Sequence, residues 1–93
     1  MIPGITDKEM EIIKSILKDY DVDFYLYGSR VKGDFSPLSD LDILVKSKFY
    51  EDIIYDLKAK FDNSSLPYVV NFTNFYDVDD KFYNLIKDNL KKI

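Results

Sequence analysis

The chain has 93 residues, enough for one small domain, so residues 1–93 are interpreted as a single unit. Its 13 Lys and Arg are outnumbered by 17 Asp and Glu; the net charge of −4 argues against a protein that binds duplex nucleic acid. The absence of cysteine and histidine excludes disulfides, sulfur or imidazole metal sites, and Cys or His catalysis. A metal ion would need oxygen ligands, as Mg²⁺ and Mn²⁺ do. No run of apolar residues is long enough to span a membrane and no signal peptide is visible, so a cytoplasmic protein is expected.

The first half of the chain predicts a helix followed by a strand. Thr6 and Glu9 have the spacing of a capping box, and a helix is predicted over residues 7–20. The aromatic run 24–27 predicts a strand that ends at Gly28. Residues 29–32 could form one helical turn, and residues 34–39 read as a loop.

The second half continues with two strands and two helices. Residues 41–45 predict a strand with Leu41, Ile43 and Val45 on one face. Helical spacing over 50–61, a strand over 68–72 after Pro67 and a helix over 78–90 follow. In the last helix four apolar residues are expected to face inward: Phe82, Leu85, Ile86 and Leu90. The order α-β-turn-β-α-β-α predicts an α/β (α+β) domain with a short mixed sheet flanked by helices.

The residues with the strongest chemical signal lie between the first two predicted strands. Gly28 allows the backbone to approach a ligand closely, Ser29 offers a hydroxyl group, and Arg30, the only arginine, adds positive charge together with Lys32. Asp40 and Asp42 point to the same face of the second strand, roughly 6.6 Å apart along it. A phosphate-binding turn beside two carboxylates suits a nucleotide bound with Mg²⁺.

This stretch resembles the signature of the minimal nucleotidyltransferases, a family within the DNA polymerase β-like nucleotidyltransferase superfamily. The resemblance is carried by Gly28-Ser29, ten intervening residues and then Asp40-x-Asp42, and it extends over essentially the whole chain. It implies a two-metal Mg²⁺ site held by Asp40 and Asp42, and phosphates held by Gly28, Ser29, Arg30 and Lys32. It also implies transfer of AMP from ATP, or of the nucleotide of another triphosphate, to a hydroxyl group. Many members resemble antitoxins that modify a tyrosine of a HEPN-type ribonuclease toxin.

The chain departs from the family pattern at the third acidic position, where it has Asn71. An amide oxygen can bind a cation, but it carries no charge and cannot accept a proton near neutral pH. Two interpretations therefore stay open: an adenylyltransferase in which Asn71 is a weakened third ligand, and a nucleotide-binding module that docks a partner without turnover. Asp77, Asp79 and Asp80 do not match the motif and are interpreted as helix-start acids.

The remaining sequence features concern partners. A polymerase-type role is disfavoured, because no basic surface or second domain is available to hold a primer. The 8 Tyr and 7 Phe are many for a domain of this size, and they predict an aromatic contact surface and a homo- or hetero-oligomer.

Overall fold

The computed structural model describes residues 2–93 as a small α+β domain, which confirms the predicted fold class. The helices are α1 (Asp7–Leu17), α2 (Ser29–Lys32), α3 (Tyr50–Asp62) and α4 (Asp80–Ile86). The strands are β1 (Asp23–Tyr27), β2 (Leu41–Lys46), β3 (Val70–Asn74) and β4 (Lys91–Lys92), and two short 3-10 turns are η1 (Phe75–Asp77) and η2 (Lys87–Asn89). Within residues 2–93, no helix combines the length and the hydropathy that crossing a bilayer requires.

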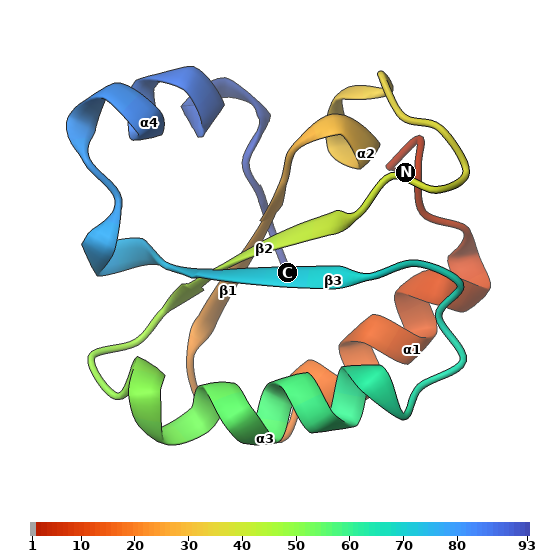
Figure 1. Ribbon diagram of the computed structural model, residues 1–93, viewed down its shortest axis with the longest axis horizontal. Coiled ribbons are helices and arrows are strands. Elements are labelled where there is room, and N and C mark those ends of the chain that lie inside the picture. The colour runs from red at the N-terminus through yellow and green to blue at the C-terminus, as the bar shows by residue number, and fades with distance from the viewer. Residues whose placement is uncertain (1) are drawn as a thin grey trace.

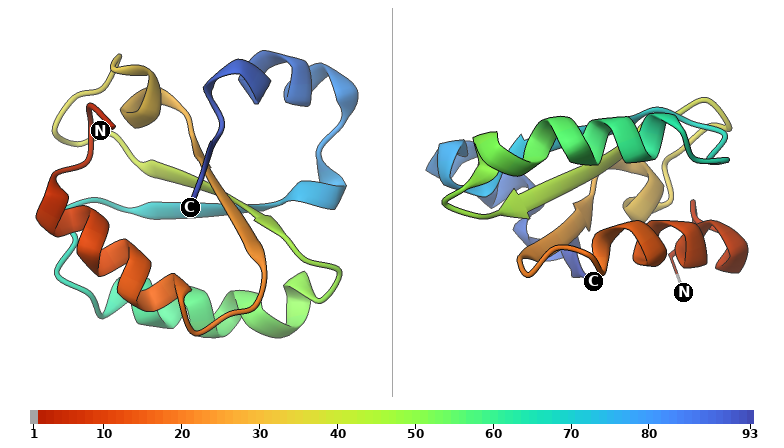
Figure 2. Two further views of the ribbon diagram at one scale, coloured as in Figure 1. Left: turned by 180° about the vertical axis from the view of Figure 1, so that it is seen from behind. Right: turned by 90° about the horizontal axis from the view of Figure 1, so that it is seen from below.

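The four strands form one mixed sheet in the order β3-β2-β1-β4. β1 is antiparallel to both β2 and β4, whereas β2 and β3 are parallel. Figure 1 shows α1 and α3 together on one side of the sheet and α4 on the other side. The view from below in Figure 2 shows α1 and α3 running side by side across that face.

The hydrophobic core lies between the sheet and the α1–α3 layer. The alternation predicted for β2 is confirmed, because Leu41, Ile43 and Val45 are fully buried against the helices. Ile13 of α1 and Leu57 of α3 meet them there, and neither side chain is exposed to solvent. Because this alternation fixes one face of β2 in the core, it turns Asp42 toward the opposite face.

The start of α1 follows the predicted capping box. The side chain of Thr6 accepts a hydrogen bond from the backbone of Glu9, and the Glu9 carboxylate accepts one from the backbone of Thr6, each 3.1 Å long. The helix ends at Leu17, three residues earlier than predicted. Tyr20 instead lies beyond the helix, where its ring packs edge-on against Phe24 and its hydroxyl group donates to Asp56.

The C-terminal third differs more from the predicted elements. β3 begins at Val70 rather than Tyr68, and the last helix is replaced by α4, η2 and the two-residue strand β4. Leu85 is 71% exposed, so its predicted inward position was wrong. The chain leaves the helix because Lys91 and Lys92 pair with the free edge of β1 and the backbone N–H of Ile93 donates to Phe24. Pairing of backbone groups at this edge overrides a helical pattern of only moderate strength.

Candidate functional site

The candidate site begins at the corner between β1 and α2. Gly28 has a φ of 88°, in the left-handed region where glycine is strongly favoured, and Ser29 starts the short helix. The backbone oxygen of Gly28 accepts hydrogen bonds from the N–H groups of Val31 and Lys32, which closes the turn. The predicted helical turn over residues 29–32 is confirmed.

The carboxylate of Asp42 lies directly against this corner. Asp42 is paired with Tyr27 across the antiparallel β1–β2 ladder, so its side chain stands next to the residue that follows Tyr27. A methyl group at Gly28 would collide with this carboxylate, and its carbon would lie 3.2 Å from Cγ of Asp42. The glycine at position 28 therefore serves two purposes: it permits the backbone turn and it leaves room for Asp42.

Asp40, Asp42 and Asn71 converge at the same end of the sheet. The parallel β2–β3 ladder pairs Asp42 with Asn71, and Asp40 immediately precedes β2. Nδ2 of Asn71 donates to Oδ2 of Asp40 at 2.9 Å and contacts Oδ1 of Asp42 at 3.5 Å. One amide group thus bridges both carboxylates, which places the three side chains around one point.

The electrostatic environment differs between the two acids. Asp40 is exposed, whereas Asp42 is half-buried. Burial raises the pKa of Asp42 above its ordinary value; the hydrogen bond from Asn71 opposes this effect and the charge of Asp40 adds to it. A nearby cation therefore stabilises a half-buried carboxylate that lies beside another negative charge more than it stabilises an exposed carboxylate.

The donor set fits Mg²⁺ that is shared with a nucleotide. Within residues 2–93, no three acidic, His or Cys residues are grouped closely enough to form a metal site by themselves. Two carboxylates and one amide supply only oxygen ligands, and Mg²⁺ in proteins is commonly bound by one or two carboxylates plus substrate phosphates. Asn71 would need to turn its amide so that Oδ1 rather than Nδ2 faces the cation.

A cavity of about 410 Å³ adjoins the corner. Gly28, Ser29 and Lys32 line one side of it, and Phe82 and Ile86 of α4 line the other. The exposed side chain of Lys32 is therefore near Ser29, as predicted. The contribution of α4 to this wall was not predicted, because no local pattern in residues 80–86 indicates which face of the sheet the helix covers.

Arg30 does not join these residues. Its side chain is buried, with 4% exposure, and its guanidinium group donates to backbone oxygens of the N-terminal segment and of the loop before β2. The structure thus differs from the predicted phosphate contact of Arg30. The physical reason is that Arg30 follows Ser29 on a single helical turn, so that the two side chains leave α2 in different directions.

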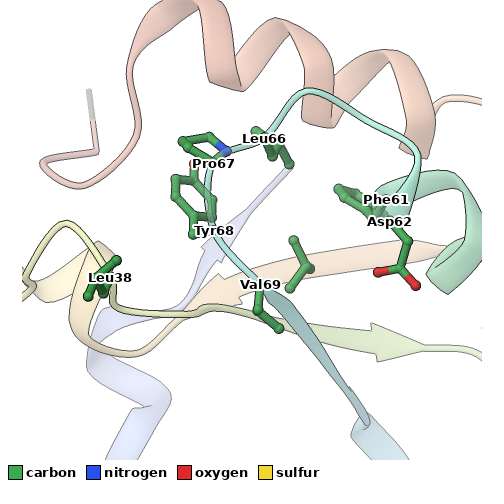
Figure 3. A pocket seen from close by; sticks show the side chains of 8 residues that line it. Leu38, Phe61, Asp62, Leu66, Pro67, Tyr68 and Val69 are labelled. Carbon is green, nitrogen blue, oxygen red and sulfur yellow. The ribbon is translucent and has the colours of Figure 1, made fainter.

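A second hollow, shown in Figure 3, lies between the loop that precedes β2 and the segment that leads into β3. Leu38 from the loop faces Leu66, Pro67 and Tyr68 across it, and Val69 lies at its floor. Its volume is about 370 Å³. Asp62 is the one charged residue among those that line it, so the lining offers no positive group to a phosphate. The apolar lining separates this hollow from the chemistry of the carboxylate pair.

The acids that follow β3 serve the fold, as predicted. Oδ1 of Asp79 accepts a hydrogen bond of 2.7 Å from the backbone N–H of Phe82 and so caps α4. Asp80 lies in the first turn of the same helix, where negative charge is favourable. Their positions explain why they do not substitute for the missing third carboxylate.

Comparison with known proteins gives two matches. A family model described as a nucleotidyltransferase domain matches residues 9–93, a range that contains Gly28, Ser29, Asp40, Asp42 and Asn71. The chain is also 32% identical over 87 residues to a protein of Haemophilus influenzae described as a probable protein adenylyltransferase MntA. That alignment covers 89% of this chain and 76% of the relative.

Proposed function

Because this chain belongs to the nucleotidyltransferase domain family, whose members are transferases, we propose that it moves AMP from ATP to a hydroxyl group of a partner protein. The observation that carries the proposal is the contact between the Gly28 corner and the Asp42 carboxylate. It supports the proposal because a turn suited to phosphate lies beside an acid suited to a cation. The printed description of the Haemophilus influenzae relative, a protein adenylyltransferase, supports the choice of a protein acceptor.

In the proposed reaction the acceptor oxygen attacks the α-phosphorus of ATP. The new P–O bond forms as the bond to the bridging oxygen of the β-phosphate breaks, pyrophosphate leaves, and the hydroxyl proton is released. Gly28 and Ser29 hold the terminal phosphates, and the Lys32 ammonium group neutralises part of their charge. Arg30 is left out of the phosphate contacts because its donors are occupied.

Asp40 and Asp42 are the proposed ligands of Mg²⁺, with the amide oxygen of Asn71 as a third ligand. When bound, Mg²⁺ would polarise the phosphoryl oxygens and balance the charge that develops in the transition state. Two carboxylates and a neutral amide carry one negative charge fewer than three carboxylates. The protein's side chains therefore favour a single cation, and a second one would depend on the phosphates for its ligands.

The proposed acceptor is a tyrosine of a HEPN-type toxin, as the family resemblance implies, and the proposed location is the cytoplasm. Exposed aromatic side chains support a protein partner: Tyr55 is 74% exposed and Tyr76 is 52% exposed. Such residues are enriched where proteins contact each other. The same side chains support the proposed homo- or hetero-oligomer.

The test uses the purified chain, MgCl₂ and radiolabelled ATP together with the product of the neighbouring gene. We expect label from α-³²P-ATP on a tyrosine of that partner and none from γ-³²P-ATP, because nucleotidyl transfer keeps only the α-phosphorus. Label from the γ-position would identify a kinase instead. ATP binding without transfer, together with partner binding, would establish the second candidate, a docking module; the neutral amide of Asn71 at the third ligand position is the observation that supports it.

The glycine at the corner allows a matched pair of variants. Gly28→Ala should weaken Mg²⁺-dependent ATP binding by roughly tenfold or more, because the new methyl group displaces Asp42. Gly33 is the control, since it has a similar φ of 98° but a methyl group there would meet only Pro3 at 3.9 Å. Gly33→Ala should lower the melting temperature through backbone strain and leave ATP binding unchanged. Calorimetric titration of both variants measures the difference, and equal binding losses would contradict the assigned contact.

A further inference from the structure

Arg30 is fixed to the loop that leads into the second strand. Nε donates to the backbone oxygen of Ser39 at 2.7 Å, and Nη2 donates to that of Pro37 at 2.8 Å, with the oxygen of Ser36 at 3.5 Å. Three carbonyl groups of one short loop therefore point at one guanidinium group. A planar group with several N–H donors can satisfy such a set, whereas a lysine ammonium group cannot reproduce its geometry.

The same side chain also holds the N-terminal segment. Nη1 of Arg30 donates to the backbone oxygen of Gly4 at 2.7 Å, and the backbone N–H of Gly4 donates to the oxygen of Arg30 at 2.9 Å. A Cβ atom at Gly4 would lie 2.7 Å from Cβ of Arg30, closer than carbon atoms pack, so only glycine fits there. The segment before α1 is thereby held against α2, as Figure 1 shows.

The third contact of Arg30 is with the segment before β3. The guanidinium carbon lies 3.7 Å from the centre of the Tyr68 ring, a close cation–π contact. Burial and the neighbouring Glu9 raise the pKa of Tyr68, so its hydroxyl group stays protonated and donates to Glu9 at 3.1 Å. Glu9 forms the capping box of α1 together with Thr6, so the Tyr68 side chain is held both at its ring face and at its hydroxyl group.

These contacts join the three segments that carry the site. Arg30 follows Ser29, Ser39 precedes Asp40, and Tyr68 lies three residues before Asn71. We propose that Arg30 is a positioning residue of the transferase site, which sets the spacing between the Gly28–Ser29 corner and the Asp40–Asp42–Asn71 group without contacting the nucleotide. The inference rests on the proposed function, because that function makes the spacing important.

The test measures Mn²⁺ binding, which does not depend on turnover. Mn²⁺ is titrated into the wild-type chain and into Arg30→Lys by electron paramagnetic resonance, with α,β-methylene-ATP present. Arg30→Lys keeps the charge but loses the planar set of donors, and we expect its Mn²⁺ affinity to fall roughly tenfold or more, as for other residues that support metal ligands. Hydrogen exchange of the backbone N–H groups of residue 36 and residues 38–41 should accelerate in parallel.

A control separates positioning from general destabilisation. Leu57→Ala removes a buried side chain of α3, a helix outside the three segments that Arg30 joins, so it should lower the melting temperature and leave the Mn²⁺ affinity of the folded chain unchanged. If circular dichroism shows that Arg30→Lys is unfolded, Tyr68→Leu replaces it, with a smaller loss of Mn²⁺ affinity expected because the hydrogen bonds from Arg30 to the loop carbonyls remain.

Three other results would contradict either the inference about Arg30 or the proposed function. Unchanged Mn²⁺ affinity in the folded Arg30 or Tyr68 variant would overturn the inference. Loss of ATP binding by Arg30→Lys in EDTA would also overturn it, since that result identifies Arg30 as a direct phosphate ligand. A wild-type chain that binds no Mn²⁺ in the presence of nucleotide would contradict the proposed function itself, which keeps the two failures distinguishable.

Discussion

Replacing Asp42 with asparagine should abolish transfer while making the free protein more stable. The transfer rate is expected to fall roughly 100-fold or more, because the loss of a charged metal ligand removes several kcal/mol of transition-state stabilisation. The new amide group has the shape of the carboxylate. Its amide oxygen can still accept from Nδ2 of Asn71, so that contact is retained.

The gain in stability follows from the raised pKa of Asp42. Burial raises this pKa, so the folded chain holds the proton to a higher pH than the unfolded chain does. The contribution of Asp42 to stability is thus most favourable below the ordinary carboxyl pKa and declines as the pH rises through the raised value. At neutral pH the carboxylate is a net cost, and Asp42→Asn should raise the melting temperature of the metal-free chain.

Calorimetry without divalent ions measures the stability, and the α-³²P-ATP assay measures transfer. Asp52→Asn is the matched control, because Asp52 is exposed in the first turn of α3 and should change neither quantity by much. The stability difference between wild type and Asp42→Asn should shrink as the pH is lowered toward the carboxyl range. A variant that retains transfer would show that Asp42 is not a ligand of the reacting complex.

The sequence predicted the parts of this molecule that local interactions determine. The capping box of Thr6 and Glu9 involves residues three apart, and the alternation of Leu41, Ile43 and Val45 follows from strand geometry alone. Strand alternation also predicted that Asp42 turns away from the core, whereas its meeting with Gly28 depends on the β1–β2 register and was expected only from the family resemblance.

Other features depend on contacts between distant parts of the chain. β4 exists because the edge of β1 accepts Lys91 and Lys92, and no property of residues 87–93 indicates that edge. Arg30 lies in a motif that suggested phosphate binding, yet its burial depends on Gly4 and Tyr68, which are far from it in the sequence. The residue type gives the charge of a side chain, but it does not give the direction in which the side chain points.

Replacing Asn71 with aspartate should strengthen cation binding and increase transfer. The new carboxylate would replace an N–H donor that lies 2.9 Å from Asp40, so three negative groups would surround one point. Charges about 4 Å apart near a protein surface interact by about 4 kcal/mol, and even after solvent screening we expect Mg²⁺ affinity to rise at least about tenfold. The third carboxylate can also accept the proton of the attacking hydroxyl group, which the amide cannot do.

The same repulsion makes this variant depend on the metal for its stability. In EDTA, Asn71→Asp should melt below the wild-type chain, and in millimolar MgCl₂ it should gain more than wild type does, because binding to the folded state alone stabilises that state. Asn63→Asp is the control, since it adds the same charge at the exposed C-terminal end of α3 and should respond to Mg²⁺ as wild type does. If Asn71→Asp melts at the same temperature with and without MgCl₂, the three side chains do not share a cation. Stronger cation binding with no transfer in either chain would favour the docking module.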